Sequence, residues 1–392
     1  MTTTVAVVTG ADAARRPHLR ALTGLRFLAA FHVVVYHFGQ PLLKEAPSPL
    51  RSLAGCGYVS VSLFFLLSGF ILAYTYLPES GPARVDPRRF WTARFARIYP
   101  VYLVGFILAA PHVVKTLVGE HGLAGGALRA LGHGAAALGL VQAWSPHTAI
   151  VWNVPAWSLS VEAFFYLLFP MLLAPAVRAA RPARLGVALA GLWAAALAPP
   201  LVYLALNPDG LTAPAGPDTR GVWLETLKYS PLARLPEFAL GVILGAWHVR
   251  SGDAGRGGGA LSVGAAAAVL APMAAARSLP YPLLHNGLLA PLFAALIVGL
   301  ARGGGPVHAL LGTRPLVLLG EASYALYILH LHGHPWTQRL LRLVDKDAAR
   351  DPAAAFWFYA VAITAASVAV FLWIETPARR WLRHRLSPRA PA

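Results

Sequence analysis

The sequence predicts an all-α fold, a polytopic helical membrane protein with about ten transmembrane helices. Charged residues make up only 12% of the 392 residues, against about a quarter in an ordinary soluble domain. Hydrophobic residues make up 57%, the mean hydropathy is +0.57, and apolar stretches of about 18 to 25 residues recur. The net charge of +17 is spread thinly between these stretches. A nucleic-acid binder would gather such charge on one water-facing surface, so we expect no nucleic-acid partner.

Each apolar stretch is a candidate span, because about 20 helical residues cross the hydrocarbon core. In order they fall at 22–40, 57–77, 99–118, 157–175, 184–206, 230–249, 259–278, 284–301, 315–334 and 354–374. A further stretch, 124–143, contains Arg129, His133 and five glycines. With ten spans and a cytoplasmic N-terminus, the inner segments carry about twice as many Lys and Arg residues as the outer ones. Counting 124–143 as a span would reverse every later loop, so we expect an outer or re-entrant segment there.

This topology divides the chain into three parts and places both termini in the cytoplasm. Residues 1–21 form a cytoplasmic N-terminal tail, residues 22–375 one transmembrane domain, and residues 376–392 a basic cytoplasmic C-terminal tail. Cys56 is the single cysteine, which excludes an intrachain disulfide. The sequence shows no ligand spacing typical of a metal site. We therefore expect no metal and no bound cofactor.

Ionisable residues inside spans cost a few kcal/mol each, which makes them candidates for function. Counting about 1.5 Å of rise per residue from the expected span starts places five of them in one layer near the outer face: His37, Glu162, Arg234, Glu237 and His330. A lone histidine in a span can instead hydrogen-bond a neighbouring helix. Arg234 and Glu237, at i and i+3, can form a structural ion pair or belong to an acceptor site.

Two further patterns lie nearer the expected inner face. In the basic segment 88–100, Arg94 and Arg97 at i and i+3 present neighbouring guanidinium groups suited to a phosphate pair. A positive-inside anchor on anionic lipid is the alternative. The small residues Ser68 and Gly69 allow close helix packing, or leave room for a thin ligand.

Several of these motifs together resemble the acyltransferase-3 family of integral membrane O-acyltransferases. Arg26, ten residues and His37 match the signature of its first span. The other matches, in chain order, are Phe64 to Phe70 (Phe-Phe-x-x-Ser-Gly-Phe), Arg94-x-x-Arg97, Trp157 to Glu162 (Trp-Ser-Leu-Ser-x-Glu), Ser323-Tyr324 with Tyr327 to His330, and Glu375-Thr376-Pro377. The chain departs from many members at Ala163 and Phe164, where they carry a second Glu and a Gln. We expect no esterase-like domain of the kind that larger members append.

The resemblance implies transfer of an acyl group, expected to be acetyl, from cytoplasmic acyl-CoA to a hydroxyl. His37 would be the general base, with Glu162 orienting the imidazole and stabilising its cationic form. His330, Tyr324 and Tyr327 are candidates for a hydrogen-bond donor to the developing oxyanion. Ser160 is a further candidate for catalytic support.

The expected donor site lies at the opposite side of the membrane from the layer of ionisable residues that contains His37. Arg94 and Arg97 would hold the phosphates of CoA, the pantetheine would pass Ser68 and Gly69, and Arg26 would bind donor or lipid. The location implied is a bacterial cytoplasmic membrane, with membrane lipid as a partner.

Several alternatives stay open at this point. A transporter or flippase of a saccharide or lipid would also suit ten spans around a buried charged layer, and a non-catalytic assembly factor would use that layer for packing alone. The acceptor can be a sugar, a polysaccharide or a lipophilic natural product such as a macrolide. The sequence predicts no oligomeric state.

Overall fold

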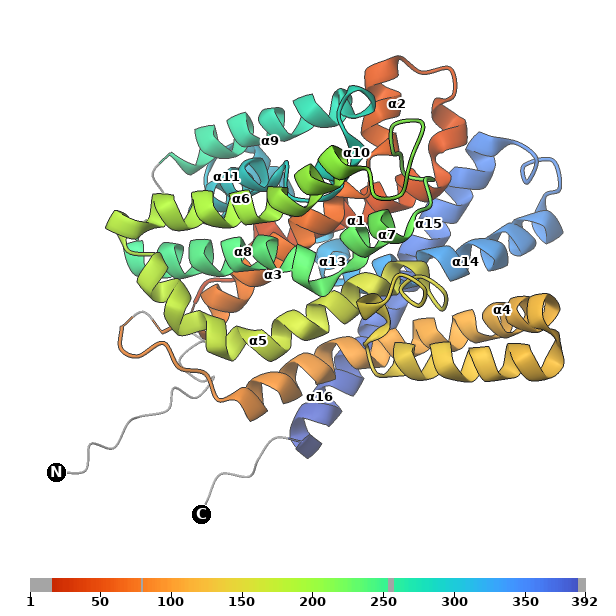
Figure 1. Cartoon of the computed structure of the whole chain (residues 1–392), viewed down its shortest axis with the longest axis horizontal. Coiled ribbons are helices and arrows are strands. Elements are labelled where there is room, and N and C mark those ends of the chain that lie inside the picture. Colours follow the sequence, from red (N-terminus) through yellow and green to blue (C-terminus); the bar gives the residue numbers. More distant parts are fainter. Residues whose placement is uncertain (1–15, 79, 253–256, 387–392) are drawn as a thin grey trace.

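The computed structural model describes residues 16–78, 80–252 and 257–386, and within these ranges the chain forms helices without a β-strand (Figure 1). The α-helices are α1 (Arg20–Phe38), α2 (Ser48–Gly55), α3 (Val59–Tyr76), α4 (Pro87–Leu138), α5 (Trp157–Ala179), α6 (Pro182–Leu206), α7 (Val222–Tyr229), α8 (Pro231–Ser251), α9 (Gly258–Ala274), α10 (Tyr281–His285), α11 (Ala290–Arg302), α12 (Gly305–Leu311), α13 (Arg314–Glu321), α14 (Ser323–Val344), α15 (Pro352–Val370) and α16 (Thr376–Leu386). Short 3₁₀ helices lie at Gln40–Leu43, Gln142–Trp144, Val154–Ala156 and Ala276–Ser278, and a π-helical turn covers Phe371–Glu375.

Eight helical segments in the described ranges are long and apolar enough to cross a membrane, which confirms the predicted all-α polytopic fold. Two of the predicted spans are not among the eight. The stretch 259–278 coincides with α9, which has 17 residues, and the stretch 315–334 is divided between α13 and α14. The total of about ten spans stays a prediction.

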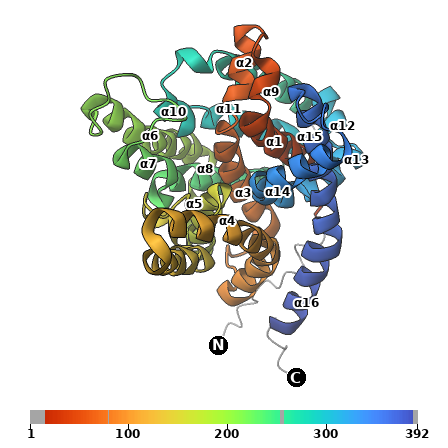
Figure 2. The same cartoon turned by 90° about the vertical axis from the view of Figure 1, so that its right-hand side faces the viewer.

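The predicted tails extend beyond the described ranges. Of the N-terminal tail, residues 1–15 lie outside them, and of the C-terminal tail, residues 387–392 do. The described part of the C-terminal tail is α16, which packs along α4 (Figure 2).

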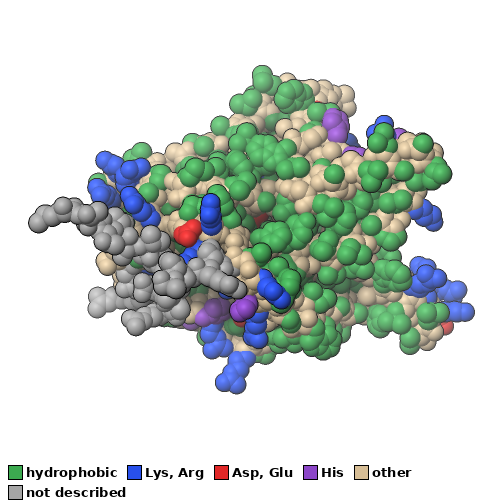
Figure 3. Space-filling model, turned by 90° about the horizontal axis from the view of Figure 1, so that it is seen from below, with side chains coloured by type: hydrophobic (Ala, Val, Ile, Leu, Met, Phe, Trp, Pro, Cys, Tyr) green, Lys and Arg blue, Asp and Glu red, His purple; other side chains and the backbone are tan. Residues whose placement is uncertain are grey.

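The surface has the distribution of side chains expected for a protein in lipid. Apolar side chains cover the middle of the face in Figure 3, and Lys and Arg gather toward its edges. Large apolar residues are freely accessible on several helices, among them Val187 (79% exposed) and Trp373 (77%). A soluble monomer rarely exposes so continuous an apolar area.

Helix α4 is a hairpin of two antiparallel limbs (Figure 1). Gly122 has φ +71°, in the left-handed region that favours glycine, and reverses the chain there. The return limb ends beside the start of the 99–118 stretch, where the Tyr99 hydroxyl donates to the Leu138 carbonyl (3.2 Å) and the Tyr102 hydroxyl to the Ala137 carbonyl (2.6 Å). The segment expected to be outer or re-entrant therefore lies antiparallel to the 99–118 stretch.

Glycines bring helix backbones at the centre of the bundle into direct contact. A Cβ atom added to Gly69 on α3 would lie 2.2 Å from the Phe238 carbonyl oxygen on α8, and one added to Gly241 on α8 would lie 1.9 Å from the Leu66 carbonyl oxygen. Small residues at helix crossings are typical of membrane proteins, because packing rather than the hydrophobic effect holds the helices together in lipid. The close pairing of α3 and α8 therefore depends on glycine at both positions, because any larger side chain would overlap the backbone of the other helix.

We expect Gly69→Ala to destabilise the protein by about 1–3 kcal/mol, the usual cost of overpacking, because the new Cβ overlaps the backbone of α8. Thermal unfolding of the purified protein in detergent measures the effect. Gly264→Ala on α9 is the matched control, since an added Cβ there meets no atom within 4 Å. Equal unfolding midpoints for the two variants would contradict the role given to Gly69.

Candidate active site

A cavity of about 470 Å³ lies between α1, α3, α4, α5 and α14. The residues at one end, Pro17 and His18, are exposed to solvent, whereas Ser158, Leu159 and Tyr327 at the other end are buried. The cavity therefore has a mouth beside the N-terminus of α1 and a closed end inside the bundle. It collects most of the predicted site residues, namely Arg26, Ser68, Arg94, Arg97, Glu162, Tyr324 and Tyr327.

The carboxylate of Glu162 accepts two hydrogen bonds inside this cavity. The Ser68 hydroxyl on α3 donates to its Oε1 atom (2.9 Å), and the Tyr166 hydroxyl, one turn further along α5, donates to the same atom (2.5 Å). The indole N–H of Trp91 on α4 donates to the Tyr166 carbonyl (3.0 Å). These bonds join α3, α4 and α5 around the carboxylate, and they leave Oε2 of Glu162 for another partner.

The described lining of the cavity has a surplus of positive charge. Four arginines belong to it, at positions 16, 26, 94 and 97, and Glu162 is the acidic residue among the lining side chains that the structure describes. Arg94 lies over the rings of Tyr76, Phe90 and Tyr166 at 5.7 to 6.0 Å, and it donates a long hydrogen bond to the Tyr76 hydroxyl (3.4 Å). Stacking of this kind holds a guanidinium plane in place while its N–H groups stay available to an anion.

His37 and His330 form a second group, beyond the closed end of the cavity. The Nδ1 atom of His37 lies 3.1 Å from Nε2 of His330 and 3.0 Å from the Val33 carbonyl oxygen. The Nδ1 atom of His330 lies 2.8 Å from the Tyr327 carbonyl oxygen, which makes it a donor. Nε2 of His330 then accepts from Nδ1–H of His37, so Nε2 of His37 carries the lone pair that a base requires.

The structure divides the predicted layer of five ionisable residues into three places. His37 contacts His330, Glu162 lies with the arginines, and Arg234 binds Ser62, six residues or about 9 Å before Ser68 along α3. The predicted contact between Glu162 and His37 is replaced by the contacts to Ser68 and to His330.

The count along the sequence assumes that α5 starts at the outer surface of the membrane. The return limb of α4 instead brings the segment 139–156 inward, and Gln142, Ala143 and Asn153 on it are buried. Helix α5 therefore starts inside the protein, and the count from a surface start does not apply to Glu162.

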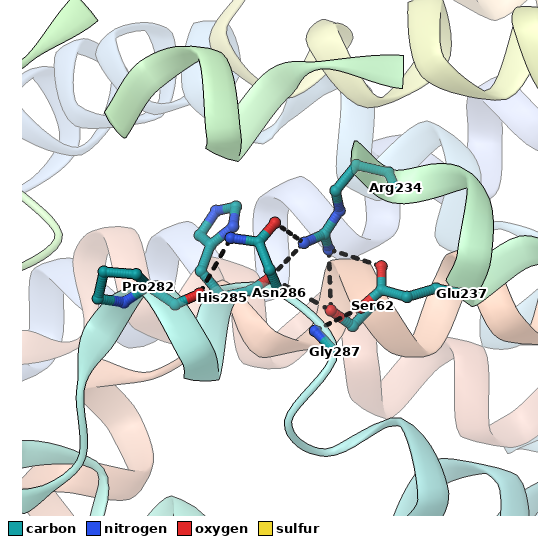
Figure 4. A network of polar contacts seen from close by, with 7 residues as sticks. All are labelled: Ser62, Arg234, Glu237, Pro282, His285, Asn286 and Gly287. Atoms are coloured by element: carbon teal, nitrogen blue, oxygen red, sulfur yellow. Dashed lines mark hydrogen bonds and ion pairs between the residues drawn. The ribbon is translucent and has the colours of Figure 1, made fainter. Parts of the chain in front are cut away.

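Arg234 and Glu237 belong to a fully buried network that joins three parts of the fold (Figure 4). Arg234 is 3.1 Å from Glu237, donates to Ser62 on α3 (2.8 Å) and to the Asn286 side chain (2.5 Å), and also donates to the His285 carbonyl. The amide of Gly287 donates to Glu237 (2.9 Å). Because all these partners are protein groups, the arrangement favours the structural interpretation over an acceptor site.

Three other predicted residues contact the backbone of neighbouring segments. Gly69 faces α8 and is not among the cavity-lining residues, so close helix packing is its role here rather than space for a ligand. Ser160 donates to the Leu140 carbonyl (2.7 Å) and accepts from the Ala143 amide (3.2 Å), which anchors the buried segment before α5. The Tyr324 hydroxyl donates to the Ile98 carbonyl (2.6 Å).

Tyr166 and Ser158 belong to the site but are not among the site residues predicted from the sequence. Tyr166 lies four residues after Glu162, a spacing that brings two side chains together on a helix and could have identified it. Ser158 hydrogen-bonds the Tyr327 hydroxyl (3.1 Å), a contact between distant segments without a local signal.

Comparison with known proteins identifies the family of the chain. Residues 19–376 match the sequence model of the acyltransferase-3 family, described as an acyltransferase domain. The chain belongs to this family. It is 33% identical over 381 residues to the acyltransferase MdmB of Streptomyces mycarofaciens, covering 94% of this chain and 93% of that protein. It is 24% identical over 327 residues to the O-acetyltransferase OatA of Staphylococcus aureus, covering 80% of this chain but 50% of that protein.

No solved structure is significantly similar to the chain. The family and these relatives establish an O-acyltransferase in an integral membrane protein, as the motifs implied. Transfer therefore needs an acyl donor and a hydroxyl-bearing acceptor.

We expect Arg234→Met to destabilise this enzyme by about 3–5 kcal/mol, because it leaves the Glu237 carboxylate buried without its ion-pair partner. The double variant Arg234→Met, Glu237→Met should recover part of the loss, since neither charge is then left unpaired. Thermal unfolding in detergent measures both. A double variant less stable than the single one would show that the two charges do not depend on each other.

Proposed function

We propose that this O-acyltransferase takes its acyl group from acyl-CoA, with acetyl-CoA as the donor. The observation that carries the proposal is the arginine-lined cavity, whose mouth lies at the end of the bundle expected to face the cytoplasm. CoA is a polyanion with a thin arm, and the cavity offers cationic groups and an end that is closed inside the bundle. One of the relatives is named an O-acetyltransferase, which supports acetyl as the group transferred.

Arg94 and Arg97 are proposed to bind the CoA phosphates. They lie one turn apart on α4, and both line the cavity. Arg26 lines the same cavity from α1. Glu162 would balance the arginines before the donor arrives, and Ser68 and Tyr166 would keep its carboxylate in place.

His37 is proposed as the general base. Its Nε2 atom takes the proton from the acceptor hydroxyl, and the hydroxyl oxygen attacks the thioester carbonyl carbon. The carbon–sulfur bond then breaks, and the CoA thiolate receives the proton from the His37 imidazolium, so that an ester and CoA–SH leave. His330 holds His37 in the tautomer that this step needs and is a positioning residue.

The acceptor is proposed to be a hydroxyl on a sugar, a polysaccharide or a lipophilic natural product such as a macrolide. His37 lies near the C-terminal end of α1, on the far side of the closed cavity end from the arginines. The acceptor would therefore approach from the opposite end of the bundle to the donor. The membrane would be a bacterial cytoplasmic membrane, with both termini in the cytoplasm.

We expect His37→Ala to lower kcat by about 10²- to 10⁴-fold, the usual contribution of a general base. Purified protein is incubated with radiolabelled acetyl-CoA and a panel of sugar, disaccharide and macrolide acceptors, and the labelled ester is measured. His112→Ala, at an exposed histidine of α4, is the control and should keep normal turnover. Near-normal turnover of the His37 variant would exclude the general-base role, and no labelled ester from the normal protein would exclude acetyl-CoA as donor.

We expect Arg94→Ala or Arg97→Ala to raise KM for acetyl-CoA by roughly tenfold or more, because each removes a charge-assisted contact to phosphate worth about 1.5–3 kcal/mol. S-acetyl pantetheine, which has no phosphate, should show the same KM with both variants as with the normal protein. Arg88→Ala, at an exposed residue outside the cavity lining, is the matched control. A role as lipid anchor alone would lower the amount of inserted protein and leave KM for acetyl-CoA unchanged.

A further inference from the structure

Two aromatic rings form the wall at the closed end of the cavity. The ring centroids of Phe64 on α3 and Tyr327 on α14 are 5.7 Å apart, with the ring planes at 71°. Both residues line the cavity, and Tyr327 is 7% exposed. The edge of one ring meets the face of the other, an arrangement that is favourable for aromatic pairs and closes the space between the two helices.

Tyr327 is held by hydrogen bonds at its hydroxyl and at its backbone carbonyl. Its hydroxyl is hydrogen-bonded to the Ser158 hydroxyl (3.1 Å), and Ser158 donates to the Pro155 carbonyl at the start of α5 (2.8 Å). Its backbone carbonyl accepts the hydrogen bond from His330. The wall is therefore attached to the same helix turn that orients the histidine pair.

The wall lies between the cavity and His37, so Phe64 must turn aside for the thioester carbonyl carbon to meet the hydroxyl bound at His37. On its far side, the Tyr327 and His330 rings are 6.2 Å apart, and Phe64 packs into the apolar cluster that contains Val33 and Val34 of α1, just before His37. A donor that enters past the arginines thus meets Phe64 and Tyr327 at the last point before the base. The end of the donor that arrives there is the acyl group, because the phosphates are at the other end of the molecule.

We propose that Phe64 and Tyr327 select the acyl group by size, so that the enzyme uses acetyl and excludes longer acyl groups. The inference rests on the proposed acyl-CoA donor and adds the class of acyl group. The opening that two closely packed rings can make has no room for additional methylene groups, and close-packed protein interiors respond to a change of even one methylene. Pockets that discriminate in this way reach about tenfold or more for each methylene group.

The test compares the binding of three donors, so it does not depend on the identity of the acceptor. Titration calorimetry gives Kd for acetyl-CoA, butyryl-CoA and hexanoyl-CoA with the purified full-length protein. The normal protein is expected to bind acetyl-CoA at least tenfold more tightly than hexanoyl-CoA. Phe64→Ala opens the end of the cavity. The ratio of Kd for hexanoyl-CoA to Kd for acetyl-CoA should therefore be at least tenfold lower in this variant than in the normal protein.

A matched variant separates the wall from the rest of the cavity. Ile71 lines the cavity from the same helix, seven residues or about 10 Å nearer the mouth. Ile71→Ala enlarges the cavity there and should leave the ratio of the two Kd values unchanged, whatever it does to either value. If Phe64→Ala does not fold, Phe64→Leu gives a smaller opening, and Tyr327→Phe keeps the ring but loses the Ser158 bond; both should shift the ratio in the same direction.

The outcomes separate this inference from the proposed function. No binding of any acyl-CoA overturns the donor and the inference together. Binding of acetyl-CoA with a ratio that neither Phe64 variant changes, or that Ile71→Ala changes equally, overturns the size selection alone. The esters formed in the radiolabel assay from acetyl-CoA and hexanoyl-CoA should follow the same ratio.

Discussion

In an apolar protein surrounded by lipid, each polar group inside must find a partner within the protein, since water cannot supply one. Arg234 shows the full form of this constraint, because its guanidinium reaches α3, its own helix and the loop after α10 in one network. The carboxylate of Glu162 does the same for α3, α4 and α5 through Ser68, Tyr166 and Trp91. The places where these groups meet fix which helices are neighbours.

The same constraint separates structure from chemistry. The contacts of Arg234 and Glu237 in this network are all to protein groups, and low-dielectric surroundings make each of these bonds costly to break. The other two groups keep capacity for a ligand. The arginines of the cavity exceed its carboxylate in charge, and among the described residues Nε2 of His37 takes part in no hydrogen bond. Apart from the structural pairs, two groups are left: arginines that can bind an anion at one end of the site, and a histidine that can accept a proton at the other end.

The sequence predicted what depends on local pattern. Apolar length identified the helices, and the i and i+3 spacing of Arg94 and Arg97 placed both on one side of α4, where they line the cavity. Position across the membrane was less predictable, because hydropathy cannot show that the segment before α5 folds inward and carries Glu162 with it. The contact between His37 and His330 joins residues 293 positions apart and has no local signal. Gly69 could serve packing or a ligand equally well by composition, and only its position against α8 decides.

The hairpin of α4 also has a consequence for how the protein is made. Its return limb contains Arg129, His133 and several glycines, and is too weakly apolar to enter a bilayer alone. Its Gly126 allows close contact with Val118 on the first limb, so the neighbouring limb replaces lipid on one side. The two limbs must therefore leave the insertion machinery as a pair. The cavity-lining residues on α5 can take their places only after both limbs have been inserted, because α5 follows them in the chain. The order of synthesis along the chain is therefore also the order in which the site is assembled.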